Sequence, residues 1–278
     1  MSGGLDRLLR DAFGALDATG LGVVDVGSRG RVHPVFDEVA PVVDAVGFEP
    51  DPEECRRLNA SVGAAGGYRS LAFLPFGLGS EDGDRTLHLC RSRGTSSLLR
   101  PNRAWLDRFP EPVRFDVERE VRVPVRALDG IVSDPEIRVP GRIDFVKVDT
   151  QGSELDVLLG ARKTLDDQVV AVEVEVEFAP LYESSVPFRE IDAYLAECGF
   201  TLFKLRRLEW VRQTFEARPE RTAGQLVFGD ALYLRDPLGR GTPWTPKDGR
   251  QAEALALTAI LYDLHDFAWE LVSPPVLG

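Results

Sequence analysis

The sequence has 278 residues, of which 44% are hydrophobic and 28% are charged, and its formal net charge is -12 at pH 7. This length is sufficient for one large α/β domain with elaborations. An acidic chain without a basic stripe argues against nucleic acid or an anionic membrane as the main partner. The N-terminal segment lacks the apolar core of a signal peptide, and no hydrophobic run is long enough for a membrane span.

The three cysteines, Cys55, Cys90 and Cys198, are far apart in the sequence and form no C-x-x-C pair. We therefore expect neither a disulfide framework nor a zinc site. We expect a cytoplasmic location, where the environment is reducing.

Hydrophobic spacing predicts an amphipathic helix over about residues 4–19, followed by a buried strand in LGVVDVG. A helix is expected over 32–46, a second strand in VDAVGFEP, a capped helix in PEECRRLNASVG and a third strand in YRSLAFLPFGLGS. A polar, Arg-rich stretch over about 81–124 contains two strand patterns, RTLHLC and VRFDVEREVRVPV. We interpret this stretch as an insertion near the mouth of the site.

Strand and helix patterns alternate again after the insertion. IDFVKVD is a core strand followed by the helix SELDVLLGARKTL, and VVAVEVEVEF is a strand followed by the helix FREIDAYLAECG. FTLFKLRRLEWVR and QLVFGDALYLR are typical of a closing antiparallel pair, and a last amphipathic helix is expected over about 250–272. This alternation predicts a single α/β domain with a mainly parallel sheet and helices on both faces. Two amphipathic terminal helices would suit a homodimer contact.

Ligands bind at the carboxyl ends of the strands in such sheets. Asp25 ends the first strand, Gly27 and Gly30 follow it, and Glu49 ends the second. Glycines at this turn let the backbone approach a ligand, and a carboxylate at the second strand suits the two hydroxyls of a ribose. The turns after the first three strands add Ser28, Pro50 and Gly77 to the expected cofactor site, and Asp149 at the tip of the fourth core strand is expected to meet the cofactor as well.

Two nucleoside cofactors fit this geometry. NAD needs a third glycine to bring a helix N-terminus to its pyrophosphate, and G-S-R-G-R-V-H lacks one. S-adenosylmethionine has no phosphate, and its sulfonium would suit an acidic lining. The residues thus favour S-adenosylmethionine, with NAD-dependent oxidoreduction as the alternative.

The chain resembles the FkbM-type S-adenosylmethionine-dependent methyltransferases in DVGSRG, GFEPDPEECRRLN, VPVRALDGIV, DFVKVDTQGSELDVLLGA and VEVEVEFAPLY…PFREIDAYLAECGF. The resemblance implies a class I methyltransferase fold with a Rossmann-like, seven-stranded sheet. It also implies methyl transfer to an oxygen of a sugar or natural product, with S-adenosylhomocysteine as the by-product. The chain departs from the family pattern at Ser28-Arg29, often Ala-Asn, and at Gln151, often Glu.

Transfer of a methyl group to a hydroxyl needs in-line geometry and usually a base. Asp149 ends the fourth core strand, and Lys147, two residues earlier, shares its face. Glu173 and Glu175, with Glu177, form a carboxylate row on the fifth. We predict catalytic roles for Asp149, Lys147, Glu173 and Glu175. A structural ion pair remains the alternative for Lys147 and Asp149, and Arg pairing remains the alternative for the acidic row.

The expected small-molecule acceptor would contact polar side chains around this tip, namely Gln151, Glu154, Ser96, Ser97 and His33. Helix capping is the alternative for Glu154, and an ordinary turn is the alternative for the serine pair. A divalent metal is not expected. A protein that kept the cofactor site but lost catalysis is a further alternative, and Gln151 is its only indication.

Overall fold

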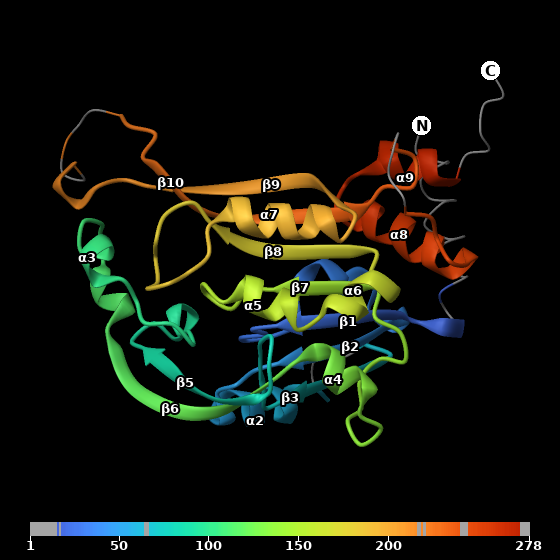
Figure 1. Ribbon diagram of the computed structural model, residues 1–278, viewed down its shortest axis with the longest axis horizontal. Helices are drawn as coiled ribbons and strands as arrows, with labels where there is room; N and C mark the ends of the chain where they lie inside the picture. The colour runs from blue at the N-terminus through green and yellow to red at the C-terminus, as the bar shows by residue number, and fades with distance from the viewer. Residues whose placement is uncertain are drawn as a thin grey trace.

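The computed structural model describes residues 16, 18–63, 67–215, 218, 221–239 and 244–272. Its centre is a seven-stranded sheet with the order β3-β2-β1-β7-β8-β10-β9 (Figure 1). The strands are β1 (Leu21–Val26), β2 (Val43–Phe48), β3 (Ser70–Leu74), β7 (Phe145–Val148), β8 (Ala171–Glu177), β9 (Phe200–Trp210) and β10 (Gln225–Arg235). Strands β3, β2, β1, β7 and β8 are parallel, whereas β10 is antiparallel to β8 and β9. The expected mainly parallel sheet of a class I methyltransferase fold is confirmed.

Helices cover both faces of the sheet because side chains alternate along each strand. In β7, Phe145 packs in one hydrophobic cluster, and Val146 and Val148 pack in the other. The Phe145 face is covered by η1 (Pro34–Val42, a 3-10 helix), α2 (Pro52–Ser61), α8 (Gly249–Leu261) and α9 (His265–Val272). The opposite face is covered by α4 (Leu128–Ser133), α5 (Glu154–Leu159), α6 (Arg162–Asp167) and α7 (Phe188–Glu197).

The insertion before the fourth core strand forms a small sheet with the order β4-β6-β5 at the left of Figure 1. Its elements are β4 (Gly77–Leu78), β5 (Gly83–Cys90), η2 (Arg93–Thr95), α3 (Arg103–Leu106), η3 (Pro112–Phe115) and β6 (Val117–Arg126). It is wider than the expected range 81–124, because Gly77 pairs with Val125 across β4 and β6. One further 3-10 helix, η4 (Gln213–Phe215), follows β9.

Three expected helices differ from the structure. The helix expected over 32–46 is a 3-10 helix with an internal Pro41, and it ends where β2 begins at Val43. The helix expected in SELDVLLGARKTL is divided into α5 and α6. Gly160 lies between them, where an added Cβ would be 2.0 Å from the carbonyl oxygen of Gly79. This close backbone contact interrupts the helix.

The helix expected over 250–272 is divided into α8 and α9, and Asp263 between them has a φ of 59°. A left-handed residue cannot continue a right-handed helix, so the chain turns there. The short helix α4 was not predicted. Most of the helix expected over 4–19 lies outside the described residues.

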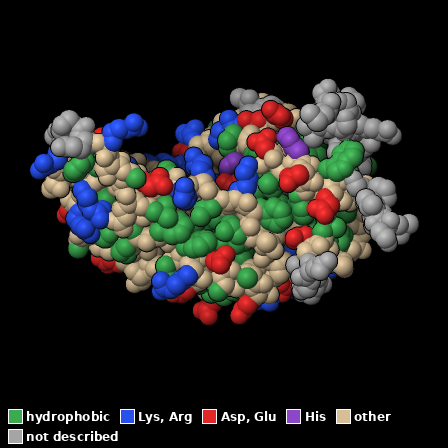
Figure 2. Space-filling view, turned by 90° about the horizontal axis from the view of Figure 1, so that it is seen from above, with side chains coloured by type: hydrophobic (Ala, Val, Ile, Leu, Met, Phe, Trp, Pro, Cys, Tyr) green, Lys and Arg blue, Asp and Glu red, His purple; other side chains and the backbone are tan. Residues whose placement is uncertain are grey.

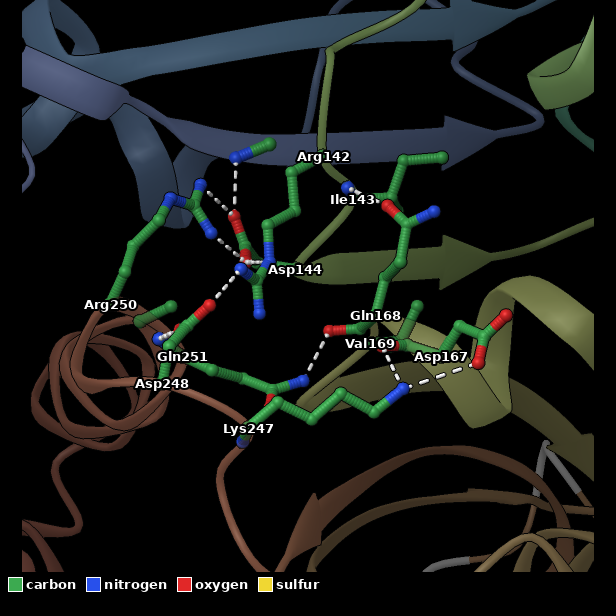
Figure 3. A network of polar contacts seen from close by, with 12 residues as sticks. Arg142, Ile143, Asp144, Asp167, Gln168, Val169, Lys247, Asp248, Arg250 and Gln251 are labelled. Carbon is green, nitrogen blue, oxygen red and sulfur yellow. Dashed lines mark hydrogen bonds and ion pairs between the residues drawn. The ribbon is translucent and has the colours of Figure 1, made fainter.

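A buried polar network joins α8 to the amino ends of β1 and β7 (Figure 3). Asp144 is fully buried and accepts hydrogen bonds from the main-chain nitrogen of Gly22 at 2.8 Å and from Arg250 at 2.6 and 2.7 Å. Arg142 pairs with Asp248 at 2.6 Å. The network lies at the end of the sheet opposite the strand tips that carry Asp25, Glu49 and Asp149.

Strand β9 forms one edge of the main sheet and pairs only with β10. Its Lys204, Arg206 and Arg207 are exposed, and exposed charges on an edge strand oppose pairing with another chain. Figure 2 shows charged side chains of both signs around a central hydrophobic area on the face seen from above. No helix in the described parts of the chain is long and apolar enough to cross a membrane.

Candidate active site

A cavity of about 280 Å³ lies at the carboxyl ends of β1, β2 and β7, and the insertion closes one side of it. Parallel strands bring their carboxyl ends to one edge of the sheet, which explains why residues far apart in sequence meet here. The predicted site residues that line it are Asp25, Gly27, His33, Glu49, Pro50, Gly77, Ser96, Ser97, Lys147, Asp149 and Gln151. The predicted residues that do not line it are Ser28, Gly30, Glu154, Glu173 and Glu175.

The turn after β1 brings the backbone against the tip of β7. Gly27 has a φ of +82°, and an added Cβ would lie 2.0 Å from the carbonyl oxygen of Asp149. Only glycine fits there. The Ser28 hydroxyl donates to the carbonyl oxygen of Asp25 at 2.5 Å, and the Gly30 nitrogen donates to Glu54 at 3.1 Å. Ser28 and Gly30 thus shape the turn, while Gly27 faces the cavity.

Lys147 lies between two carboxylates at the strand tips. Its Nζ is 3.7 Å from Asp25 Oδ1 and 3.2 Å from Asp149 Oδ2. Burial lowers the pKa of Lys147, but the charges of Asp25 and Asp149 outweigh burial and raise its pKa above the ordinary value. Lys147 is therefore cationic at neutral pH and acts as a fixed positive charge rather than as a base.

Asp25 is buried, and burial raises its pKa despite the charge of Lys147. Its Oδ2 accepts the main-chain N–H of His33 at 2.8 Å, whereas its Oδ1 has no hydrogen-bond partner among the described residues. A buried acceptor without a partner at the wall of a cavity is available to a donor group of a ligand.

Glu49 directly follows β2 and is also buried. Its Oε1 accepts the main-chain N–H of Asp51 at 2.8 Å, and burial raises the pKa of Glu49 to about 7. Its second oxygen forms no hydrogen bond within the described parts of the chain, and the residue lines the cavity. Glu49 can therefore accept hydrogen bonds from a diol, as its position after β2 suggested.

Gln151 follows Asp149 in an unusual left-handed conformation, with a φ of 62°. Its Nε2 donates to Asp149 Oδ1 at 2.9 Å and to Glu175 Oε1 at 2.7 Å. Its Oε1 accepts from the Tyr182 hydroxyl, and its carbonyl oxygen accepts from the Ser97 hydroxyl at 2.7 Å. Together these contacts stabilise the left-handed backbone of Gln151 and hold its side chain at the cavity wall.

Glu154 is buried and binds the backbone of the turn before α5. Its Oε1 accepts from the main-chain nitrogens of Thr150 at 2.9 Å and Gly152 at 3.0 Å. This arrangement matches the capping alternative, because the carboxylate binds free N–H groups ahead of the helix. Ser96 and Ser97 line the cavity, and the Ser96 hydroxyl accepts the main-chain N–H of Cys90 at 3.0 Å.

The acidic row on β8 is buried, and none of its three carboxylates forms an ion pair with an arginine among the described residues. Glu173 Oε1 lies 3.4 Å from His33 Nε2, and its Oε2 accepts the hydroxyl of Tyr262. Burial raises the pKa of Glu173, but the contacts with His33 and Tyr262 bring it below the ordinary value. Glu177 accepts the Ser185 hydroxyl at 2.6 Å.

Sequence reasoning missed several residues of the site. Tyr262 comes from the turn between α8 and α9, and Tyr182 follows β8. Leu87 and Leu89 of β5 line the cavity, as do Phe48, Phe76, Leu78, Leu98, Arg29, Arg31 and Arg93. The alternation in RTLHLC was a usable signal for the two leucines, but nothing local to Tyr262 indicates its contact with Glu173.

Within the described residues, no group of three His, Cys, Asp or Glu side chains is arranged to hold a metal ion.

Comparison with known proteins finds no match among curated sequences. Solved structures with similarity include a magnesium protoporphyrin IX methyltransferase from Synechocystis PCC 6803 with bound S-adenosylmethionine (12% identity, 84% of this chain, 77% of that chain, TM-score 0.40). They also include the methyltransferase FkbM from Methylobacillus flagellatus KT (16% identity, 78% of this chain, 44% of that chain, TM-score 0.42). Residues 31–202 match the family described as the methyltransferase FkbM domain. This match spans more than half of the sequence, and the chain belongs to the FkbM methyltransferase family.

Proposed function

We propose that the chain is an S-adenosylmethionine-dependent O-methyltransferase that acts on a hydroxyl group of a small molecule. The observation that carries this proposal is the shared cavity. One cavity is lined by the glycine turn after β1, by the buried carboxylate of Glu49 after β2 and by the carboxylate of Asp149 after β7.

The lining suits the cofactor. Glu49 would accept the ribose hydroxyls, and Gly27 leaves space beside the turn. The Oδ1 of Asp25 is 3.7 Å from Lys147 but forms no hydrogen bond with the described residues, and it would accept one from the amino-acid end. The segment after the turn is the 3-10 helix η1 rather than an α-helix, so the α-helix N-terminus that receives a pyrophosphate is missing at this turn. This favours S-adenosylmethionine over NAD.

The residues around Asp149 suit the acceptor. When bound, S-adenosylmethionine supplies a methyl group that passes from sulfur to the acceptor oxygen and leaves S-adenosylhomocysteine. Asp149 would accept the hydroxyl proton, because its carboxylate lines the cavity. Lys147 and Gln151 each hold one oxygen of that carboxylate, at 3.2 and 2.9 Å, and so fix its orientation.

Thermal denaturation tests the cofactor directly. Saturating S-adenosylhomocysteine should raise the Tm by several degrees, and NAD should leave it unchanged. Glu49→Gln should reduce the shift, because the amide is a weaker acceptor for the ribose hydroxyls. Glu53→Gln, on an exposed residue of the same helix region, is the matched control and should keep the full shift. Stabilisation by NAD alone would refute the proposal.

A further inference from the structure

A second cavity of about 340 Å³ adjoins the first one. Gly94 and Gln151 line both cavities, so the two meet at the wall formed by these residues. The second cavity lies between the insertion and the β9–β10 pair, because its lining comes from Phe115 on one side and Trp210 and Phe228 on the other. Nothing in the proposed cofactor site uses this space.

The walls of the second cavity are mainly apolar and aromatic. Phe115 and Trp210 have ring centroids 6.3 Å apart, and Trp210 and Phe228 have centroids 5.9 Å apart at an interplanar angle of 79°. Leu181 and Leu208 complete the apolar lining. Such walls favour a flat ring over a sugar, since a sugar needs many polar partners for its hydroxyls.

Few polar groups of this cavity are free for a ligand. Glu175 is occupied by Gln151, at 2.7 Å, and burial raises its pKa, together with the charge of Asp149. Burial and the charge of Asp149 thus both disfavour the ionised form of Glu175, which weakens its repulsion of an anion.

Arg114 is the cationic side chain of this lining. Its Cζ lies 4.5 Å from the ring centroid of Trp210 and 5.1 Å from that of Phe115. It forms no ion pair or side-chain hydrogen bond with the described residues, and its Nε is buried without a partner. Arg114 is thus a half-buried cation held between rings. The charge of Glu111 acts on it, but no carboxylate of the described residues forms an ion pair with it, so it is suited to an anionic group of a ligand.

We infer that the second cavity binds the methyl acceptor, and that this acceptor is a hydroxylated aromatic carboxylate. The ring lies among Phe115, Trp210 and Phe228, the carboxylate pairs with Arg114, and a ring hydroxyl faces the shared wall at Gln151, next to Asp149. This inference rests on the proposed function, because it names the acceptor class for the same reaction.

Calorimetric titration of the complex with S-adenosylhomocysteine tests the inference. The probes are 3,4-dihydroxybenzoate, its neutral analogue 3,4-dihydroxybenzamide, and methyl glucoside. The benzoate should bind about tenfold more tightly than the benzamide, which is the expected gain from one Arg–carboxylate pair. Methyl glucoside should bind most weakly.

Substitutions test which residues cause the preference for the benzoate. Arg114→Gln should abolish the preference for the benzoate and leave the affinity for S-adenosylhomocysteine unchanged. Arg122→Gln, on an exposed arginine of β6, is the matched control and should keep the preference. Trp210→Leu should weaken both aromatic probes equally and keep their ratio.

The possible results separate the two proposals. If S-adenosylhomocysteine fails to bind the wild-type chain, the proposed function is wrong. If it binds, the acceptor inference is overturned by any one of three results: equal affinity for benzoate and benzamide, tighter binding of the glucoside, or no binding of either aromatic probe. A benzoate preference that survives in Arg114→Gln would also overturn it.

Discussion

The side-chain nitrogen of Gln151 lies 2.7 Å from a carboxylate oxygen of Glu175, and it links the turn after β7 to β8. The same nitrogen donates to Asp149 at 2.9 Å. An amide can donate to two carboxylates at once, whereas a carboxylate at this position would place a third acid beside them.

Gln151→Glu should therefore lower the free energy of unfolding by about 2 kcal/mol near pH 8. The new carboxyl would have a raised pKa in the folded state, so its penalty grows as the pH rises and shrinks towards pH 5. Urea denaturation at both pH values measures this. Gln213→Glu, at an exposed position, is the control. An equal loss at both pH values would contradict the charge explanation.

The pKa of Glu49, raised to about 7, predicts a pH-dependent cofactor affinity. The ionised carboxylate is the better acceptor for a ribose diol, so the Kd for S-adenosylhomocysteine should rise about tenfold when the pH falls from 8 to 6. Calorimetry on the wild type and on Glu49→Gln measures this, and the variant should bind weakly at every pH. A wild-type Kd independent of pH would exclude Glu49 from the ribose contact.

The same pKa affects stability in the absence of ligand. Between the ordinary value of 4.5 and about 7, the folded chain keeps a proton on Glu49 that the unfolded chain releases. The contribution of Glu49 to stability is therefore complete below this window and is lost as the pH rises through it. The difference in unfolding free energy between wild type and Glu49→Gln should change across this window, and a constant difference would contradict the assignment.

Lys147 holds the charges of Asp25 and Asp149 together at the strand tips. Lys147→Met should cost about 3 kcal/mol of unfolding free energy, because it leaves Asp25 buried without a cation. Asp25→Asn combined with Lys147→Met should recover part of this loss, since the unpaired buried charge is removed. Urea denaturation of both variants measures the difference, with exposed Lys163→Met as the control. A double variant no more stable than Lys147→Met would refute the electrostatic coupling.

Arg250 and Asp144 join helix α8 to the sheet at the end opposite the cavity (Figure 3). Arg250→Met should cost about 3 kcal/mol, because the fully buried Asp144 would lose its hydrogen bonds to Arg250 and keep as its cationic partner only Arg142, in a weaker contact at 3.8 Å. Arg162→Met breaks an exposed pair with Asp166 and a cation–π contact with Tyr194, and it should cost less than about 1 kcal/mol. Chemical denaturation compares the two. Binding of S-adenosylhomocysteine by folded Arg250→Met should stay unchanged, and a lost affinity would show that the network also supports the site.

The local pattern of the sequence was sufficient to predict the strands of the main sheet. Each core strand is an apolar or alternating run bounded by turn residues, so its position follows from burial and period. The alternation of β8 also predicted that Glu173, Glu175 and Glu177 share one face. Strand tips were equally predictable, because Asp25 lies at the end of such a run and Glu49 and Asp149 directly follow one. Helix ends were less predictable, since the break at Gly160 depends on a contact with Gly79 far away in the sequence.

What the sequence by itself determined is the parallel sheet, the carboxylates at its tips and the family. These depend on neighbours along the chain, and short-range spacing encodes them. Only the tertiary structure decided the partners of those carboxylates. Glu173 meets His33 and Tyr262, and Glu175 meets Gln151, rather than the arginines that the composition offered. A buried charge takes the partner that folding brings within hydrogen-bond distance, and that partner can come from any part of the chain.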